Sequence, residues 1–352
     1  MEVSFYPVAT KGNKYSEIIT SLLIRNGIRI YSLSYIFSDF SAFRRVDILH
    51  LNWFENLEGV TKFSVFTVFF KKVCKLLIFK LFRKKIVWTM HNKIPHDKSM
   101  LLLKQVIVHL LILFSDRIII HSKVSEGILL KISKKAKAKI RYIPHPDYIG
   151  CYGDIIGTPK QIDGVEPLKL LFLGAVKPYK NIELLLDVVR PLGNRVCLTI
   201  AGTPQDSRYK QSLIEYSKGC SNVIFDLKFI PDDQISKYIS DCDLLVMPYD
   251  LRSSLNSGTV ILAFSYAKTV ICPEIGTISD LHENSCVLSY KYESENEHLS
   301  ALSSTLLRAI DIERKFPGAL RNYGNEMFKY VSKENNKNSI VRQFVEVYEG
   351  IV

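Results

Sequence analysis

The segment from residue 244 to residue 276 constrains the fold of this chain most strongly. Residues 244–247 (LLVM) form a short apolar run that ends at Pro248, which is typical of a buried parallel strand. After a polar loop, residues 258–266 predict a helix and residues 269–272 predict a second strand. This order is a βαβ unit, and such units build parallel α/β sheets.

The start of the predicted helix is rich in small polar side chains. Ser254, Asn256, Ser257, Gly258 and Thr259 lie in or next to its first turn. Unpaired backbone N–H groups and the helix dipole make such a terminus an anion site, and small side chains let a phosphate approach closely. The alternative is that Ser254 or Ser257 serves only as the helix cap.

The same strand and helix pattern covers the whole chain. Strands are predicted at residues 2–6, 28–33, 48–51, 86–89, 117–121, 140–143, 168–173, 196–201 and 223–225. At 352 residues the chain exceeds the size at which single cores stop growing, about 250–300 residues, so two domains are expected. Glycine and proline are frequent at 149–167, which marks the boundary. We therefore expect domains at 1–155 and 167–335, with a last helix within 336–352.

Composition limits the classes of partner. The formal net charge of +12 indicates acidic partners such as phosphorylated substrates or anionic lipid. No nucleic-acid recognition module accompanies this charge, so nucleic-acid binding is not expected. The 7 cysteines are scattered without a CxxC pair, which indicates a reduced, intracellular protein without a metal site. The first residues predict a strand and a loop rather than a signal peptide, so we expect a cytoplasmic location.

Residues 60–86 combine lysines with phenylalanine, leucine and isoleucine. Lys71, Lys72, Lys75 and Lys80 interrupt the segment too often for a membrane span. We expect an amphipathic helix that lies on the anionic inner face of the cell membrane. The alternative is a helix packed on the sheet with a solvated basic face. The more apolar residues 98–114 predict a buried helix that includes His109 as a core histidine.

A second loop carries cations. A predicted strand ends at Gly174, and Lys177 and Lys180 follow before the next helix. Ligands of open α/β sheets bind beyond the carboxyl ends of the strands, so both lysines are expected to face the loop at 253–259. Two cations opposite a helix N-terminus suit a diphosphate. The alternative is that both are surface charges.

Together these motifs resemble GT-B glycosyltransferases. The stretches GAVKPYKNIELLL, AGTP, FIPDDQISKYISDCDLLVMPY and SLNSGT are similar to the family-4-type group that uses nucleotide-sugar donors. The resemblance implies two Rossmann-like, doubly wound parallel-sheet domains that face each other across a cleft. It places Lys180 on the donor diphosphate, Lys177 near it, and the nucleotide base beside Phe229 and Ile230. It implies a GDP- or UDP-linked hexose donor, with mannose as one candidate, and neither cofactor nor metal.

The chain departs from that group at one motif. The group has two glutamates separated by seven residues, and the matching positions here are Ser254 and Leu262. The LNSG sequence at this place resembles a subgroup that includes β-mannosyltransferases of bacterial exopolysaccharide assembly. Glu274 either replaces the lost contact to the donor sugar or is a surface residue. Inversion is favoured, with a retaining transferase and a noncatalytic sugar-nucleotide-binding membrane protein as the alternatives.

An inverting transfer needs a general base on the acceptor hydroxyl. His91 directly follows a predicted strand, and the segment HNKIPHD resembles the HN…PH segment of related transferases. We expect His91 to act as the base or to bind the leaving phosphate, with His96 as the second candidate. A structural histidine that caps the loop is the alternative for His91. Asp47, His50 and Glu55 are weaker candidates.

The acceptor side rests on the resemblance. Gly12, Asn13 and Tyr15 match the N-terminal loop that faces the acceptor in this group, and His145 matches a stretch that lines the cleft. The expected acceptor is a lipid-linked saccharide of bacterial surface polysaccharide synthesis. The closing helix near residues 340–348 would, by resemblance, cross back to the first domain.

Overall fold

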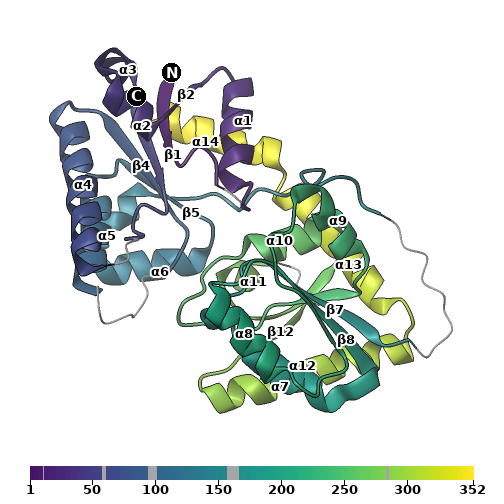
Figure 1. The fold of residues 1–352 in the computed structure, drawn as a ribbon. Helices are drawn as coiled ribbons and strands as arrows, with labels where there is room; N and C mark the ends of the chain where they lie inside the picture. Colours follow the sequence, from purple (N-terminus) through teal and green to yellow (C-terminus); the bar gives the residue numbers. More distant parts are fainter. Residues whose placement is uncertain (11, 58–60, 94–100, 157–165, 283–284) are drawn as a thin grey trace. The chain divides into compact units, whose positions relative to one another are not determined.

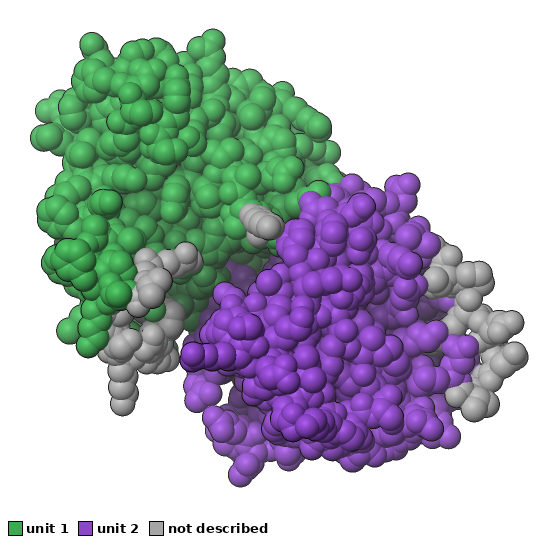
Figure 2. Space-filling model, viewed as in Figure 1, with its two compact units in different colours: residues 1–146, 336–352 green, residues 147–335 purple. Residues whose placement is uncertain are grey.

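A computed structural model describes residues 1–10, 12–57, 61–93, 101–156, 166–282 and 285–352. The chain forms two compact units (Figure 2). Unit 1 comprises residues 1–146 and 336–352, and unit 2 comprises residues 147–335. Each unit contains one six-stranded sheet in which all paired strands are parallel. This architecture confirms the expected α/β class with two Rossmann-like domains.

The sheet of unit 1 has the order β2-β1-β3-β4-β5-β6 (Figure 1). Its strands are β1 Glu2–Tyr6, β2 Arg29–Ser32, β3 Ile48–Asn52, β4 Lys85–Met90, β5 Arg117–Ile120 and β6 Ile140–Tyr142. Its helices are α1 Tyr15–Arg25, α2 Leu33–Ser38, α3 Phe40–Arg45, α4 Lys62–Leu81, α5 Leu101–Phe114, α6 Lys123–Ile132, the 3₁₀ helix Lys134–Lys139 and α14 Lys337–Glu349. Every residue of β3 is buried, as its apolar sequence indicates for a central strand.

The sheet of unit 2 has the order β12-β11-β10-β7-β8-β9. Its strands are β7 Leu168–Leu173, β8 Val196–Ala201, β9 Val223–Asp226, β10 Leu244–Val246, β11 Thr269–Pro273 and β12 Leu288–Tyr290. Its helices are α7 Ile182–Val189, α8 Ser207–Tyr216, α9 Asp232–Ser240, α10 Gly258–Ser265, α11 Gly276–Ser279, α12 Glu295–Lys315, α13 Ala319–Glu334 and the 3₁₀ helices Pro178–Lys180 and Arg190–Arg195.

Several local predictions need correction. The strand expected at 28–33 is shorter, because Ser32 caps α2 by accepting a hydrogen bond from the Tyr35 N–H at 3.2 Å. The basic helix ends at Leu81, and the chain then turns through Arg83, whose φ is 55°, into β4. His109 is exposed on α5 rather than in the core, and its Nδ1 lies 2.7 Å from the carbonyl oxygen of Gln105.

The closing helix α14 belongs to unit 1. It packs on α1 and buries Ile340, Val341, Phe344, Val347 and Tyr348, the apolar residues at helical spacing. The side chain of Asn336 accepts hydrogen bonds from the backbone N–H groups of Asn338 and Ser339, which fixes the start of the helix. Unit 1 is therefore completed by a helix that begins more than 180 residues downstream of Pro146.

Across the part of the chain that is described, no helix is both long enough and apolar enough to cross a membrane.

Candidate active site

The strand order of unit 2 identifies the edge where a ligand would bind. Counted within the unit, β9-β8-β7-β10-β11-β12 is the order 3-2-1-4-5-6 of a doubly wound sheet. The strand order reverses between β7 and β10, because β8 and β9 lie on one side of β7 and β10 to β12 lie on the other. Ligands of such sheets bind in the crevice beyond the carboxyl ends of the strands at this point. The loop after β7 carries Lys177 and Lys180, and the loop after β10 leads to the N-terminus of α10. The two predicted loops are thus neighbours.

Lys180 is the central cation of this edge. Its Nζ lies 3.9 Å from the centre of the Tyr249 ring and 5.2 Å from the centre of the Tyr179 ring. Burial lowers the pKa of the Lys180 ammonium, with smaller influences from Tyr179, Cys272 and Lys177. A partly desolvated cation gains from an anionic ligand, so the side chain is suited to a phosphate.

Tyr249 connects Lys180 with the start of α10. Its hydroxyl lies 3.0 Å from Oγ of Ser257, within hydrogen-bonding distance. Burial raises the pKa of Tyr249 to about 12, so the phenol stays neutral. Ser257 is the N-cap of α10, because its Oγ accepts a hydrogen bond from the Val260 N–H at 3.2 Å. The capping role that we weighed for Ser257 is therefore present.

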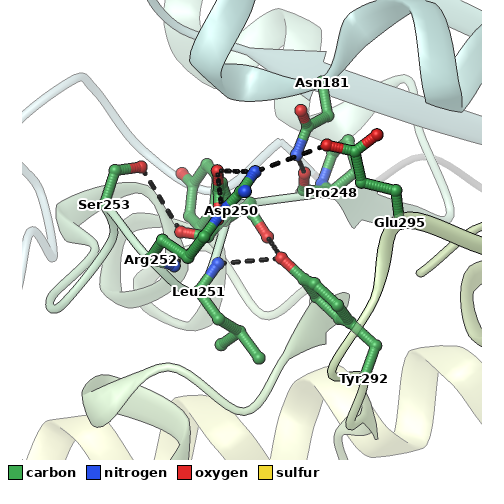
Figure 3. Close-up of polar contacts among 9 residues, drawn as sticks. Asn181, Pro248, Asp250, Leu251, Arg252, Ser253, Tyr292 and Glu295 are labelled. Atoms are coloured by element: carbon green, nitrogen blue, oxygen red, sulfur yellow. Dashed lines mark hydrogen bonds and ion pairs between the residues drawn. The ribbon is translucent and has the colours of Figure 1, made fainter. Parts of the chain in front are cut away.

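The loop between β10 and α10 is held from several elements (Figure 3). The Asn181 side-chain amide donates to the Pro248 carbonyl at 2.9 Å, and the Leu251 N–H donates to the Tyr292 hydroxyl at 2.8 Å. Arg252 forms an ion pair with Asp250 at 2.9 Å. These contacts hold the loop that carries Ser254 and Asn256 and that ends at Gly258.

Glycines shape the loops beyond β7 and β8. Gly174 has a φ of 134°, which disfavours any other residue. A Cβ on Gly202 would lie only 1.7 Å from the Gly174 carbonyl oxygen, so the two loops approach each other as closely as their backbones allow. The strand that ends at Gly174 therefore leads directly into the lysine loop without a side chain at the turn.

The remaining predicted donor residues are spread along the same edge. Phe229 is exposed and Ile230 buried in the loop that joins β9 to α9, on the far side of β8. Glu274 follows β11 and pairs with exposed Lys291 at 3.3 Å. The structure brings Lys180 and Ser257 together around Tyr249.

The carboxyl edge of the unit 1 sheet carries a group of histidines and aromatic residues. The His91 ring stacks on Trp53 at 4.0 Å with an interplanar angle of 18°, and it lies 4.8 Å from the Tyr15 ring. The rings of His121 and His145 lie 5.3 and 5.2 Å from Tyr15. Tyr15 is fully buried at the centre of this group. The structure therefore brings the catalytic candidate His91 together with the acceptor-side candidates Tyr15 and His145.

Hydrogen bonds define the protonation of two of these histidines. Asn52 donates its amide to the Tyr6 carbonyl, so its oxygen faces His91 Nε2 at 3.0 Å and Nε2 carries the proton. His121 donates from Nδ1 to the Ile143 carbonyl at 2.7 Å, so its Nε2 accepts from the Tyr15 hydroxyl at 2.8 Å. His91 and His121 are therefore opposite tautomers.

A second set of hydrogen bonds lies within the sheet. His50 Nε2 lies 2.8 Å from the Thr89 hydroxyl oxygen, and His50 Nδ1 forms a hydrogen bond with the hydroxyl of Tyr348 on α14. The Tyr348 side chain therefore ties the closing helix to the sheet through His50.

Burial keeps these histidines neutral. It lowers the pKa of His50 and of His121 to about 3 and that of His145 to about 4. The pKa of His91 is also lowered well below its usual value, by burial and by its neighbours His121, His145 and His50. At neutral pH each imidazole therefore has one donor and one acceptor nitrogen.

The remaining candidates of unit 1 are two acceptor-side residues, Gly12 and Asn13, and two candidates for the base, His96 and Asp47. Gly12, with a φ of 74°, and Asn13 lie in the turn before α1, where Asn13 Oδ1 accepts from the Tyr15 N–H at 2.9 Å. His96 lies outside the described residues. Asp47 accepts a hydrogen bond from the Glu2 N–H at 2.9 Å, before the start of β3 and so at the opposite edge of the sheet.

Sequence reasoning did not identify four residues at these edges: Tyr249, Trp53, Thr89 and His121. Trp53 directly follows β3, Tyr249 lies three residues beyond the end of β10, and His121 follows β5 as His91 follows β4. Position after a strand was thus the signal for these three residues, whereas Thr89 lies inside β4. Within the described ranges no three His, Cys, Asp or Glu side chains are arranged to hold a metal ion.

Part of unit 2 matches a known protein family. Residues 167–308 match the model of the family described as Glycosyl transferases group 1. This region holds the Lys180 loop, Tyr249 and α10, so the matched segment contains the whole donor-side group described above.

Particular relatives are similar over part of the chain. Two proteins from Xanthomonas campestris pv. campestris, both named GDP-mannose:glycolipid 4-beta-D-mannosyltransferase, are 29% and 28% identical over 235 residues. The alignments cover 65% of this chain and 62% of the relatives, so the chain matches less than two thirds of their length.

Solved structures share the fold over the full chain. The structure of Anabaena HepE in complex with UDP-glucose has a TM-score of 0.72 at 14% identity and covers 100% of both chains. A glycosyltransferase from Rickettsia africae has a TM-score of 0.66 at 16% identity and covers 99% of this chain and 98% of its own. At these identities the likeness establishes the two-domain fold.

Proposed function

We propose that this protein is a glycosyltransferase that moves a hexose from a nucleoside diphosphate sugar to a glycolipid acceptor. The observation that carries the proposal is a group formed by Lys180, Tyr249 and the N-terminus of α10. It lies at the point where the strand order of the unit 2 sheet reverses. It offers a cation, hydroxyls and helix N–H groups to a diphosphate. The Glycosyl transferases group 1 match over residues 167–308 supports this assignment.

We further propose mannose as the sugar and GDP as the carrier, because both named relatives use GDP-mannose. Their product is β-linked. Transfer from an α-linked sugar nucleotide to a β-linked product inverts the anomeric carbon, which agrees with Ser254 and Leu262 at the positions of the two glutamates. A role in bacterial surface polysaccharide synthesis and membership of the LNSG subgroup belong to the same proposal.

In this proposal the diphosphate charge is met by Lys180, Lys177 and the α10 terminus, with neither a metal nor a cofactor. His91 is the proposed base. Its Nε2 proton is directed at Asn52, so the lone pair is at Nδ1, and burial keeps the ring neutral and able to accept a proton. Tyr15 and His145 belong to the proposed acceptor side, together with Gly12 and Asn13.

The exposed face of α4 supports binding to a membrane surface. Phe63, Phe66, Phe70, Leu77 and Leu81 are exposed at helical spacing, whereas Val65, Leu76 and Phe79 are buried. A large apolar stripe with Lys71 beside it is typical of a helix that inserts its side chains into an anionic lipid surface. We therefore propose a peripheral location at the cytoplasmic face of the membrane, where a glycolipid acceptor would be available.

A thermal-shift panel tests the donor class. GDP, UDP, ADP and dTDP are each added to the wild-type protein and to Lys180→Ala. A nucleotide at 100 times its dissociation constant stabilises the folded state by about 2.7 kcal/mol. Stabilisation by one nucleotide that is lost in the variant supports the proposal, and no stabilisation by any nucleotide refutes it.

A further inference from the structure

The loop after β3 lies where the strand order of the unit 1 sheet reverses. In the order β2-β1-β3-β4-β5-β6, β2 is added on one side of β1, and the strands from β3 onward are added on the other side. Ligands of doubly wound sheets bind beyond the carboxyl ends of the strands at such a point. Trp53 is the first residue after β3, and Glu55 follows two residues later.

Trp53 is held in an uncommon conformation. Its φ is 50°, in the left-handed region that bulky residues rarely adopt, and such conformations gather at functional sites. One face of the indole stacks on His91 at 4.0 Å, and the Tyr15 ring meets it at 5.7 Å. Trp53 remains partly exposed. The backbone thus keeps a large aromatic surface at the sheet edge rather than in the core.

Lys72 of α4 fixes this loop from outside. Its Nζ lies 2.8 Å from the carbonyl oxygen of Phe54 and 2.6 Å from that of Asn56, and it lies 4.8 Å from the centre of the Phe54 ring. The Asn56 N–H also donates to the Trp53 carbonyl at 3.1 Å. A loop held by these contacts presents its side chains in a fixed arrangement.

Glu55 has an unsatisfied oxygen. The residue is only 6% exposed, and its Oε2 accepts a hydrogen bond from Trp88 Nε1 at 3.2 Å. Its Oε1 is buried and accepts no hydrogen bond from the described residues. Burial also raises the pKa of Glu55 to about 7. A buried carboxyl oxygen without a partner is costly, and a ligand that donates a hydrogen bond to it would remove that cost.

We infer that the loop from Trp53 to Asn56 is the subsite for a pyranose ring of the acceptor. The aliphatic C–H face of the ring would pack on Trp53, and one ring hydroxyl would donate a hydrogen bond to Glu55 Oε1. An aromatic surface beside a carboxyl acceptor matches the two faces of a sugar, apolar across the ring and polar at its rim. The inference rests on the proposed glycosyl transfer for naming the sugar as the acceptor.

Intrinsic fluorescence tests this subsite, because the chain has only 2 tryptophans, Trp53 and Trp88. The probes are cellobiose and the methyl glycosides of mannose and glucose, with sorbitol at equal concentration as an acyclic polyol control. We expect a saturable change with at least one cyclic probe in the wild-type protein. Trp53→Phe should lose most of this change, whereas Trp88→Phe, which keeps Trp53 but loses the hydrogen bond to Glu55, should still show a saturable change with weaker binding. Glu55→Gln should bind about 3- to 10-fold more weakly, because its amide meets the sugar with a donor.

Three results would overturn the inference: no saturable change with any cyclic probe, an equal change with sorbitol, or an undiminished change in Trp53→Phe. Near-ultraviolet circular dichroism confirms that each variant is folded. Stabilisation by nucleotide, which reports on unit 2, is measured on the same samples. If the wild-type protein binds nucleotide but sugar does not change the Trp53 fluorescence, only the subsite is refuted. If the wild-type protein does not bind nucleotide, the proposed function itself is refuted.

Discussion

The Lys180 Nζ lies 3.9 Å from the centre of the Tyr249 ring, and the Tyr249 hydroxyl lies 3.0 Å from the Ser257 side chain that caps α10. One tyrosine therefore connects the cation of the β7 loop to the helix N-terminus of the β10 loop. Because both ends of this contact offer charge or hydrogen bonds to an anion, the proposed donor site is preorganised. Predictions about donor binding follow from this arrangement.

Replacing Lys180 should remove most of the donor affinity. A charged hydrogen bond contributes about 1.5–3 kcal/mol, so Lys180→Ala should weaken nucleotide diphosphate binding by about 10- to 150-fold. Isothermal titration with the nucleotide that stabilises the wild type measures this change. The matched control is Lys218→Ala, because Lys218 is an exposed lysine of unit 2 that pairs only with Glu215 in the contacts described. Equal affinities in the two variants would contradict the diphosphate assignment.

Tyr249 should act through both its hydroxyl and its ring. Tyr249→Phe removes the hydrogen bond to Ser257, so the free energy of unfolding should fall by about 1 kcal/mol and the nucleotide affinity by only a few-fold. Tyr249→Leu also removes the cation–π contact with Lys180, worth about 0.5–2 kcal/mol more. Urea unfolding and nucleotide titration of both variants measure the two effects. Phe and Leu variants with the same affinity would show that the ring is unimportant.

His91 should matter for turnover and not for donor binding. General base catalysis contributes about 10²- to 10⁴-fold, so His91→Gln should lower kcat by that range. Because His91 lies in unit 1 and Lys180 in unit 2, the nucleotide affinity of the variant should stay at the wild-type value. Single-turnover transfer and nucleotide titration on one preparation separate the two quantities. Turnover within a factor of two of wild type would exclude His91 as the base.

The neutral histidines should make the protein sensitive to acid. His50 and His121 have pKa values of about 3 when folded, against about 6.5 in an unfolded chain. Between these values the unfolded state binds more protons, so the free energy of unfolding should fall as the pH is lowered from about 6.5. Each can remove up to about 2 kcal/mol at pH 5. Glu55, with its pKa raised to about 7, opposes this between about 4.5 and 7, and the histidines outnumber it.

Urea unfolding at pH 5, 6 and 7 measures the slope. His50→Gln should flatten it, because the pKa of His50 is lowered by burial. The comparison uses slopes rather than absolute stabilities, because the substitution also changes local contacts. A wild-type protein equally stable at pH 5 and pH 7 would contradict the neutral cluster.

The apolar stripe of α4 should bind lipid. Phe66→Asp combined with Phe70→Asp should reduce sedimentation with vesicles that contain phosphatidylglycerol by at least about tenfold, because two buried aromatic side chains contribute about 1.5–3 kcal/mol each. The control is Phe316→Asp, an equally exposed phenylalanine of unit 2. If the double variant and the control bind vesicles alike, α4 is not the contact surface.

The fold could be predicted from sequence because apolar runs mark its strands. Buried parallel strands such as residues 244–247 have no polar face, and the Pro and Gly around them fix their ends. Short helices were missed, since α2 and α3 span only six residues each and lack an apolar period. His109 was misplaced because the helix it belongs to is apolar on more than one face, and sequence alone does not reveal which face is covered.

The candidate site could be predicted only as two separate loops. That Lys177, Lys180 and Ser257 follow strands of one sheet was visible, because carboxyl ends of parallel strands share an edge. The role of Tyr249 was not visible, because it depends on a side-chain contact across that edge. The hydrogen bond between Tyr348 and His50 joins residues about 300 positions apart, and no local pattern encodes such a contact.

Transfer of the sugar is the central claim, and its most direct measurement is product analysis. The protein is incubated with each of GDP-mannose, UDP-glucose and other labelled sugar nucleotides and a polyprenyl-diphosphate-linked saccharide, and the extracted lipid is examined by NMR. We predict that one donor gives a lipid-linked product with a new β-glycosidic bond, and that Lys180→Ala gives none. An α-linked product would contradict inversion alone. No product from any donor, with acceptor bound and nucleotide bound, would contradict the account of this protein as a glycosyltransferase.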